Sequence, residues 1–170
     1  MSLLSCTKRS KVKKAGILVL VTFSLMVISS STVMAEEPDY MLEPEYGSVE
    51  LDADFKNDPY TREIHVGGEV SIRDIGFIGY VAEAPDFDLY YEPGYDYPLI
   101  ISVEPGYGLD GDDIVLLINA PDEEWYFAWE SLGPEIKFEN PESGLYNIWV
   151  GTISKNDYAE EATLYISEIE

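Results

Sequence analysis

Cysteine and histidine are nearly missing from this chain: among its 170 residues, Cys6 and His65 are the single example of each. One cysteine cannot close a disulfide within the chain, and one histidine falls short of the two or more ligands typical of a zinc hydrolase. His65 stands between Ile64 and Val66, so the alternation predicts that it faces solvent from a strand rather than acting as a catalytic base. The sequence also contains no Gly-x-Ser-x-Gly motif, which argues against a serine hydrolase.

Basic residues are few as well. The chain has 10 Lys and Arg against 33 Asp and Glu. Half of the basic residues fall within the first 14 positions and every acidic residue follows position 35, so residues 36–170 carry 5 basic and 33 acidic side chains, a formal net charge of −28. Such a charge repels nucleic acid and anionic lipid headgroups, so neither is expected as a partner, and it attracts cations. Plain solubility or adaptation to salty surroundings would explain the same charge.

The first 35 residues are typical of a secretory signal peptide. Basic residues between Lys8 and Lys14 precede the uncharged apolar run Ala15–Ile28, and Val33–Ala35 then supplies a cleavage site. The apolar run is shorter than the ~20 residues of a membrane-spanning helix. We therefore expect cleavage after Ala35, a secreted or periplasmic mature protein, and no stable membrane insertion of the mature chain. A retained membrane anchor is the alternative.

A sustained helical period is missing from residues 36–170. Glu36–Gly47 is acidic and contains two prolines, which predicts a flexible lead-in. From residue 48 to residue 170, apolar residues instead recur at every second position or in short runs, separated by turn residues about every 8–12 positions. We expect a single all-β domain over 48–170, an antiparallel, jelly-roll-like β-sandwich of roughly 8–10 short strands.

The segment Pro134–Gly151 gives the clearest pattern. Ile136 and Phe138 alternate with charged residues, a turn follows over residues 140–144, and apolar residues then alternate again up to Val150. The period of two predicts two paired strands, each with one face in a core. Trp149 lies on the opposite face of the second strand, where we expect it to face solvent.

Aspartates are clustered directly before the apolar run Ile114–Ile118, in the loop that starts at Leu109. Hard cations prefer several oxygen ligands, and a glycine-containing loop of aspartates can supply them. The sequence therefore predicts a calcium site formed by Asp110, Asp112 and Asp113. The loop lacks the residue order of an EF-hand, and a solvated acidic turn is the alternative.

Aromatic residues gather in a second loop, over residues 90–97. Exposed tyrosine and tryptophan rings can stack on sugars or anchor a protein partner. We take Tyr91, Tyr95, Tyr97 and Trp149 as the candidate contact surface for a protein or a polysaccharide. Ordinary packing in a sheet is the alternative, because aromatic residues are also favoured in strands.

Five segments together resemble the pre-peptidase C-terminal domain family of secreted bacterial and archaeal proteins. They are Ala84–Tyr91, Pro98–Val103, Asp113–Asp122, Pro134–Gly151 and Ala162–Ser167, and the resemblance spans residues 76–168. It implies a jelly-roll-like β-sandwich that is not itself catalytic and that aids secretion, targeting or substrate binding beside secreted proteases. Some relatives bind calcium or collagen.

The resemblance also implies one substitution of chemistry. Relatives of the closest type tend to carry two cysteines at the positions that Phe77 and Phe127 occupy here. We expect an aromatic contact between these two side chains where the relatives would have a disulfide.

The sequence thus favours a secreted, non-catalytic binding or accessory module that is also a candidate for calcium binding. One alternative is a small secreted hydrolase that uses paired carboxylates, for which a deep cleft with two facing acids would be evidence. The other is an envelope structural protein without a ligand. A flat aromatic patch or a cation site in a loop would favour the module.

Overall fold

The fold is all-β, as the sequence predicts. The computed structural model describes residues 37–94, 97–108, 110–155 and 160–169. The elements are β1 (Ser48–Asp52), β2 (Tyr60–Val66), β3 (Val70–Ser71), β4 (Tyr80–Val81), β5 (Phe87–Glu92), β6 (Leu99–Pro105), a 3₁₀ turn (Gly111–Asp113), β7 (Ile114–Asn119), β8 (Trp125–Ala128), β9 (Glu135–Phe138), β10 (Gly144–Thr152) and β11 (Glu160–Ser167). Two of these strands, β3 and β4, have only two residues each. Among the described residues, no helix is long and apolar enough to cross a membrane.

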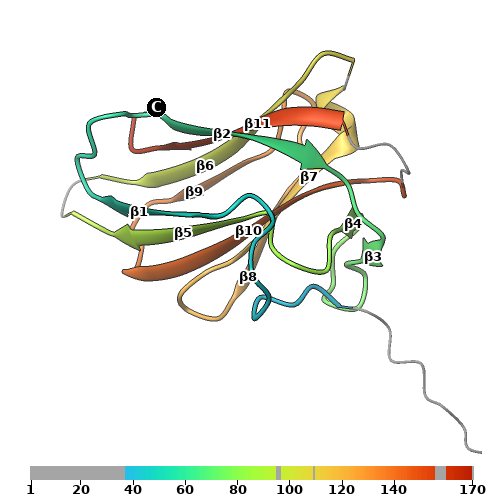
Figure 1. The fold of residues 1–170 in the computed structure, drawn as a ribbon, viewed down its shortest axis with the longest axis horizontal. Helices are drawn as coiled ribbons and strands as arrows, with labels where there is room; N and C mark the ends of the chain where they lie inside the picture. The colour runs from blue at the N-terminus through green and yellow to red at the C-terminus, as the bar shows by residue number, and fades with distance from the viewer. Residues whose placement is uncertain (1–36, 95–96, 109, 156–159, 170) are drawn as a thin grey trace, which may run out of the picture. The chain divides into compact units, whose positions relative to one another are not determined.

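The strands form two sheets that pack as a sandwich (Figure 1). Sheet A has seven strands, with β1, β5, β10, β4 and β3 in order and with β7 and β8 added beside β10. Sheet B has four strands in the order β2, β11, β6 and β9. The pairing is antiparallel except that β1 runs parallel to β5. The chain leaves β1 for the other sheet before it returns to β5, so no hairpin links this pair.

The strands β9 and β10 follow each other in the chain, but they are not paired, so the predicted pairing around residues 140–144 was wrong. β9 pairs with β6 in sheet B, whereas β10 pairs with β5, β7 and β4 in sheet A. The alternation identified the buried faces correctly, because Ile136 and Tyr146 are both buried. Phe138 of β9 meets Tyr146 of β10 edge to face, with ring centroids 5.2 Å apart. The turn therefore carries the chain across the core from one sheet to the other.

The main core lies between the two sheets. Alternate residues of each strand supply it, including Leu89, Ile101, Leu116 and Leu164, all of which are buried. Burying apolar side chains of this size is the principal stabilising term of such a sandwich. Tyr60 of β2 and Phe87 of β5 also stack on each other between the two sheets.

A second core covers the outer face of sheet A. It contains Trp149, which is 0% exposed, so the prediction that Trp149 faces solvent was wrong. The connection between β3 and β4 folds over this face, and Ile72 and Phe77 from its vicinity pack against the same cluster as Trp149. Trp125 lies beside Trp149 as well, with ring centroids 5.3 Å apart. Strand β10 is therefore buried on both faces.

The aromatic contact predicted between Phe77 and Phe127 is confirmed. The two rings stack with centroids 5.0 Å apart and planes 13° apart. Phe127 belongs to β8, whereas Phe77 precedes β4. The stack thus holds the β3–β4 connection against β8 on the outer face of sheet A, where both rings pack against the second core.

The described part of the lead-in lies against the domain, which corrects the prediction that residues 36–47 form a flexible segment. The amide of Asp39 donates to the carbonyl of Glu83 at 2.7 Å, and the amide of Tyr46 donates to the carbonyl of Asp86 at 2.8 Å. Tyr40 also meets Trp125 edge to face. Backbone pairing of this kind outweighs an acidic, proline-containing composition. The predicted signal peptide, residues 1–35, lies outside the described residues.

Replacement of the buried Trp149 tests the second core. We expect Trp149→Ala to lower the free energy of unfolding by about 3–5 kcal/mol, because it removes a fully buried indole and leaves a cavity. Trp129→Ala is the matched control, since Trp129 is 46% exposed, and it should cost less than about 1 kcal/mol. Urea denaturation measures both values, and Trp149→Phe serves if the alanine variant does not fold. Equal losses for Trp149→Ala and Trp129→Ala would contradict the second core.

Candidate functional site

The predicted aromatic contact surface is not assembled in the described residues. Tyr91 is 2% exposed, since it shares the inward face of β5 with Leu89, and its hydroxyl donates to the buried Glu168. Burial and then that hydrogen bond raise the pKa of Tyr91 above its usual range. Tyr97 is 43% exposed and Tyr95 lies outside the described residues. With Trp149 buried, Tyr97 alone of the described candidates remains available to a partner.

The neighbour of Tyr91 points the other way. Tyr90 is 45% exposed on the outer face of sheet A, in register with Glu50 of β1 and Leu145 of β10. It lines a pocket of about 270 Å³ together with Glu50 and Glu92. We call this the sheet A pocket, and it is a small acidic site with one accessible ring.

The predicted calcium ligands do not converge. Asp110, Asp112 and Asp113 are all exposed, and the described residues hold no group of three or more His, Cys, Asp or Glu side chains placed to bind a metal ion. Their backbone carbonyls serve the fold instead. The carbonyl of Asp112 accepts from the indole of Trp129, and that of Asp113 accepts from the amide of Ile153. The geometry therefore gives the calcium hypothesis no support, and it stays a prediction from the sequence.

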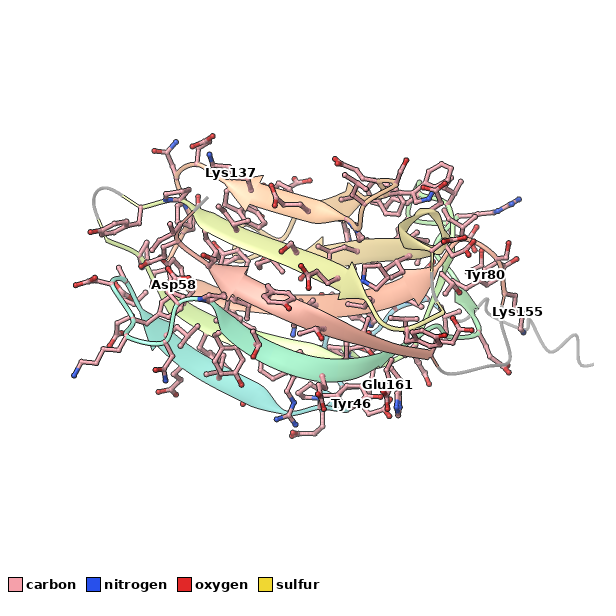
Figure 2. All side chains as sticks on the ribbon, turned by 90° about the horizontal axis from the view of Figure 1, so that it is seen from above. Tyr46, Asp58, Tyr80, Lys137, Lys155 and Glu161 are labelled. Carbon is pink, nitrogen blue, oxygen red and sulfur yellow. The ribbon has the colours of Figure 1, made fainter. Side chains whose placement is uncertain are left out.

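A concave surface lies on the outer face of sheet B. It has a volume of about 590 Å³. We call it the outer groove, and its lining residues are Asp58, Pro59, Ile100, Ser102, Glu104, Glu135, Tyr165, Ser167 and Ile169. Figure 2 looks onto this face, with Asp58 near one end, Lys137 on β9 and Glu161 towards the opposite end of β11. The groove therefore crosses β11, β6 and β9.

Cross-strand register places the polar groups of the outer groove. Tyr165 of β11 lies opposite Ser102 of β6, which in turn lies opposite Glu135 of β9. Glu104 stands two residues beyond Ser102 on the same face, and its Oε2 accepts the hydroxyl of Tyr165 at 2.8 Å. That hydrogen bond is the main cause of a raised pKa for Tyr165, so the phenol stays protonated and oriented. Ser102 thus lies between the ring of Tyr165 on β11 and the carboxylate of Glu135 on β9, with Glu104 two residues further along its own strand.

One end of the outer groove is closed by hydrogen bonds within the domain. Asp58 Oδ1 accepts from the hydroxyl of Ser167 at 2.6 Å, and Asp58 Oδ2 accepts from the amide of Glu168 at 3.1 Å. Glu168 Oε2 also accepts from the amide of Asp54 at 2.7 Å. Asp58 therefore holds the β1–β2 connection to the end of β11, and this use of both its oxygens makes it a structural wall of the groove.

The carboxylates of the outer groove suit binding better than acid catalysis. A carboxyl group that acts as a general acid near neutral pH must be desolvated so that it keeps its proton. Glu104 and Glu135 are both exposed. The acids with raised pKa values lie elsewhere, in sheet A, where Asp86 and Asp88 serve the backbone and Asn147. Neither Glu104 nor Glu135 has the burial that a general acid needs.

Sequence reasoning missed Tyr165, Glu104 and Glu135. Each lies on the solvent side of an alternating strand, so the alternation alone could have placed them outside the core. What it could not show is that β11, β6 and β9 are neighbours. His65 was placed correctly: it is exposed on β2, with Nε2 3.9 Å from a carboxylate oxygen of Glu161.

Asp86 is a buried carboxyl group whose contribution to the stability of the fold depends on pH. Its Oδ2 accepts from the amide of Val150 at 2.6 Å, and its own amide donates to Ile148 at 2.8 Å. Burial raises the pKa of Asp86 well above its usual range, although the Val150 amide opposes this, and Glu45 adds to it. The folded protein holds this proton more tightly than the unfolded chain does. Stability from Asp86 is therefore fully present below pH about 4 and is lost as the pH rises through the folded pKa.

The variant Asp86→Asn tests this effect. Its side chain stays neutral at every pH and keeps an oxygen acceptor for Val150. We expect the variant to gain stability relative to the wild type between pH 4 and pH 8, by on the order of 1 kcal/mol or more. Urea denaturation of both proteins at several pH values measures the difference, and a difference that does not change with pH would contradict the assignment.

Calcium binding at Asp110, Asp112 and Asp113 is tested by thermal unfolding. If these side chains bind the ion, millimolar calcium should raise the melting temperature of chelator-treated protein, because ligand binding stabilises the folded state. Magnesium at the same concentration serves as the control. An unchanged melting temperature would end the calcium hypothesis.

No protein-family model matches this chain, and no curated protein matches it either.

Proposed function

We propose that the protein is a secreted, non-catalytic binding or accessory module, and that the outer groove is where it contacts a protein or polysaccharide partner. The observation that carries this proposal is the difference between the two outer faces of the sandwich. The face of sheet A around Trp149 is covered by a second core, whereas sheet B has a groove of about 590 Å³ on its outer face. Clefts of roughly 300–1,000 Å³ are typical of ligand sites.

The groups in the groove have the chemistry of recognition. Tyr165 supplies a partly exposed ring, Ser102 a hydroxyl group, and Glu104 and Glu135 accessible carboxylates. Such a mixture binds through stacking and directional hydrogen bonds. The hydrogen bond from Tyr165 to Glu104 restrains both side chains before a partner arrives, which lowers the entropy lost on binding.

Export and family membership belong to the same proposal. The basic and apolar N-terminal segment supports secretion, and the five segments that resemble pre-peptidase C-terminal domains support an accessory role. The sandwich and the contact between Phe77 and Phe127 agree with that resemblance. An accessory role requires an accessible face, and the outer groove provides one.

Replacement of Tyr165 tests the proposed function. The purified protein is applied to a panel of polysaccharides and to a panel of peptides, and bound ligands are then compared between variants. We expect Tyr165→Ala to weaken binding about tenfold or more, because a central aromatic residue often dominates an interface. Tyr90→Ala is the matched control, since Tyr90 is an exposed tyrosine on the other sheet, and its binding should match the wild type.

Two results would contradict the proposal. One is that the wild-type protein binds nothing on either panel. The other is that Tyr165→Ala binds each ligand as well as the wild type does. Either result would instead fit an envelope structural protein without a ligand.

A further inference from the structure

We propose that the outer groove binds a basic side chain, foremost an arginine, carried by an extended segment of a protein partner. The inference rests on the proposed binding function and names the ligand of that groove. It is carried by the placement of an aromatic ring and two carboxylates around Ser102, within a concavity large enough for a short peptide segment.

The strand register brings these groups together. Tyr165 and Glu135 flank Ser102 from the two neighbouring strands. Glu104 is the diagonal neighbour of both, and diagonal neighbours in a sheet have Cα atoms about 7–8 Å apart. A planar guanidinium group over Ser102 can therefore reach both carboxylates. The arrangement follows from three strands of fixed register, β11, β6 and β9, so it is in place without a conformational change.

The aromatic ring and the carboxylates both favour a positively charged ligand. A guanidinium group stacks on an aromatic face and donates paired hydrogen bonds to carboxylates. The Tyr165 hydroxyl is already donated to Glu104, which fixes the ring edge beside that carboxylate. A basic side chain would thus meet the face of one group and the oxygens of the others.

The charge of the surroundings has the same sign. Glu63 and Glu161 lie on the same outer face as the groove, on β2 and β11. Of the described basic side chains on this face, Lys137 lies 3.3 Å from a carboxylate oxygen of Glu139, and His65 lies 3.9 Å from one of Glu161. The chain as a whole has a net charge of −23. An approaching basic segment is therefore attracted over a long range, and an acidic one is repelled.

A protein segment fits these groups better than a polysaccharide does. Two polar groups of the groove, Asp58 and Ser167, are hydrogen-bonded to each other at 2.6 Å. The more accessible groups, Glu104 and Glu135, are charged acceptors, and a neutral sugar would not compensate their charge. Arginine and lysine provide both the donors and the charge.

The test is a titration of the purified protein with a ten-residue peptide that carries three arginines, followed by calorimetry. We expect the double variant Glu104→Gln/Glu135→Gln to bind at least tenfold more weakly than the wild type. The matched control is Glu50→Gln/Glu92→Gln, which removes the same charge from the sheet A pocket and should bind within about twofold of the wild type. Melting temperatures confirm that all variants fold.

The remaining arms separate the explanations. The arginine peptide should bind more weakly in 500 mM than in 50 mM salt. Equal losses in both double variants would show attraction by net charge alone and would overturn the inference. Binding of cellohexaose that Tyr165→Ala abolishes, without binding of the arginine peptide, would overturn the inference and leave the proposed function standing. Binding of neither ligand would count against both.

Discussion

Burial of β10 on both faces is the constraint on which the rest of the structure depends. The inward residues Tyr146, Ile148 and Val150 pack between the sheets, and Trp149 packs on the outside. A strand buried in this way needs neighbours on both edges and cover on both faces. It pairs with β5 and β4 along one edge and with β7 along the other, and the β3–β4 connection covers its outer side. Sheet A is consequently closed to partners around Trp149, and sheet B is left as the open face.

Much of this fold could be predicted from alternation and composition. The strands, the inward residues and the position of His65 all follow from a period of two, because a side chain in a strand can point to only two sides. The errors arose where the exposure of one side of a strand depends on a segment that is distant in the sequence. Trp149 sits at a correctly assigned outward position, and it is buried because residues more than 70 positions earlier fold over it. Tyr91 is the last inward-facing residue of β5, although the composition around it had indicated a loop.

The candidate site was harder to predict than the fold, for a related reason. Tyr165, Ser102 and Glu135 come from three strands whose order along the chain gives no sign of their order in the sheet. The apparent hairpin over Pro134–Gly151 pointed the other way, because it placed β9 beside β10. The aspartate cluster at Asp110 was prominent in the sequence because its residues are neighbours in the chain. Such clusters say little about which side chains converge in a sandwich whose paired strands are distant in the sequence.

The place of β11 within sheet B has a consequence for how the chain acquires its structure. β11 lies between β2 and β6, so it joins the first strand of that sheet to the rest, yet it is synthesised after both. Until residues 160–167 emerge, β2 has no partner in its sheet and one wall of the main core is incomplete. Non-local pairing of this kind folds slowly. A chain exported as proposed would therefore stay incompletely folded at least until β11 has been synthesised, which favours threading across a membrane in the unfolded state.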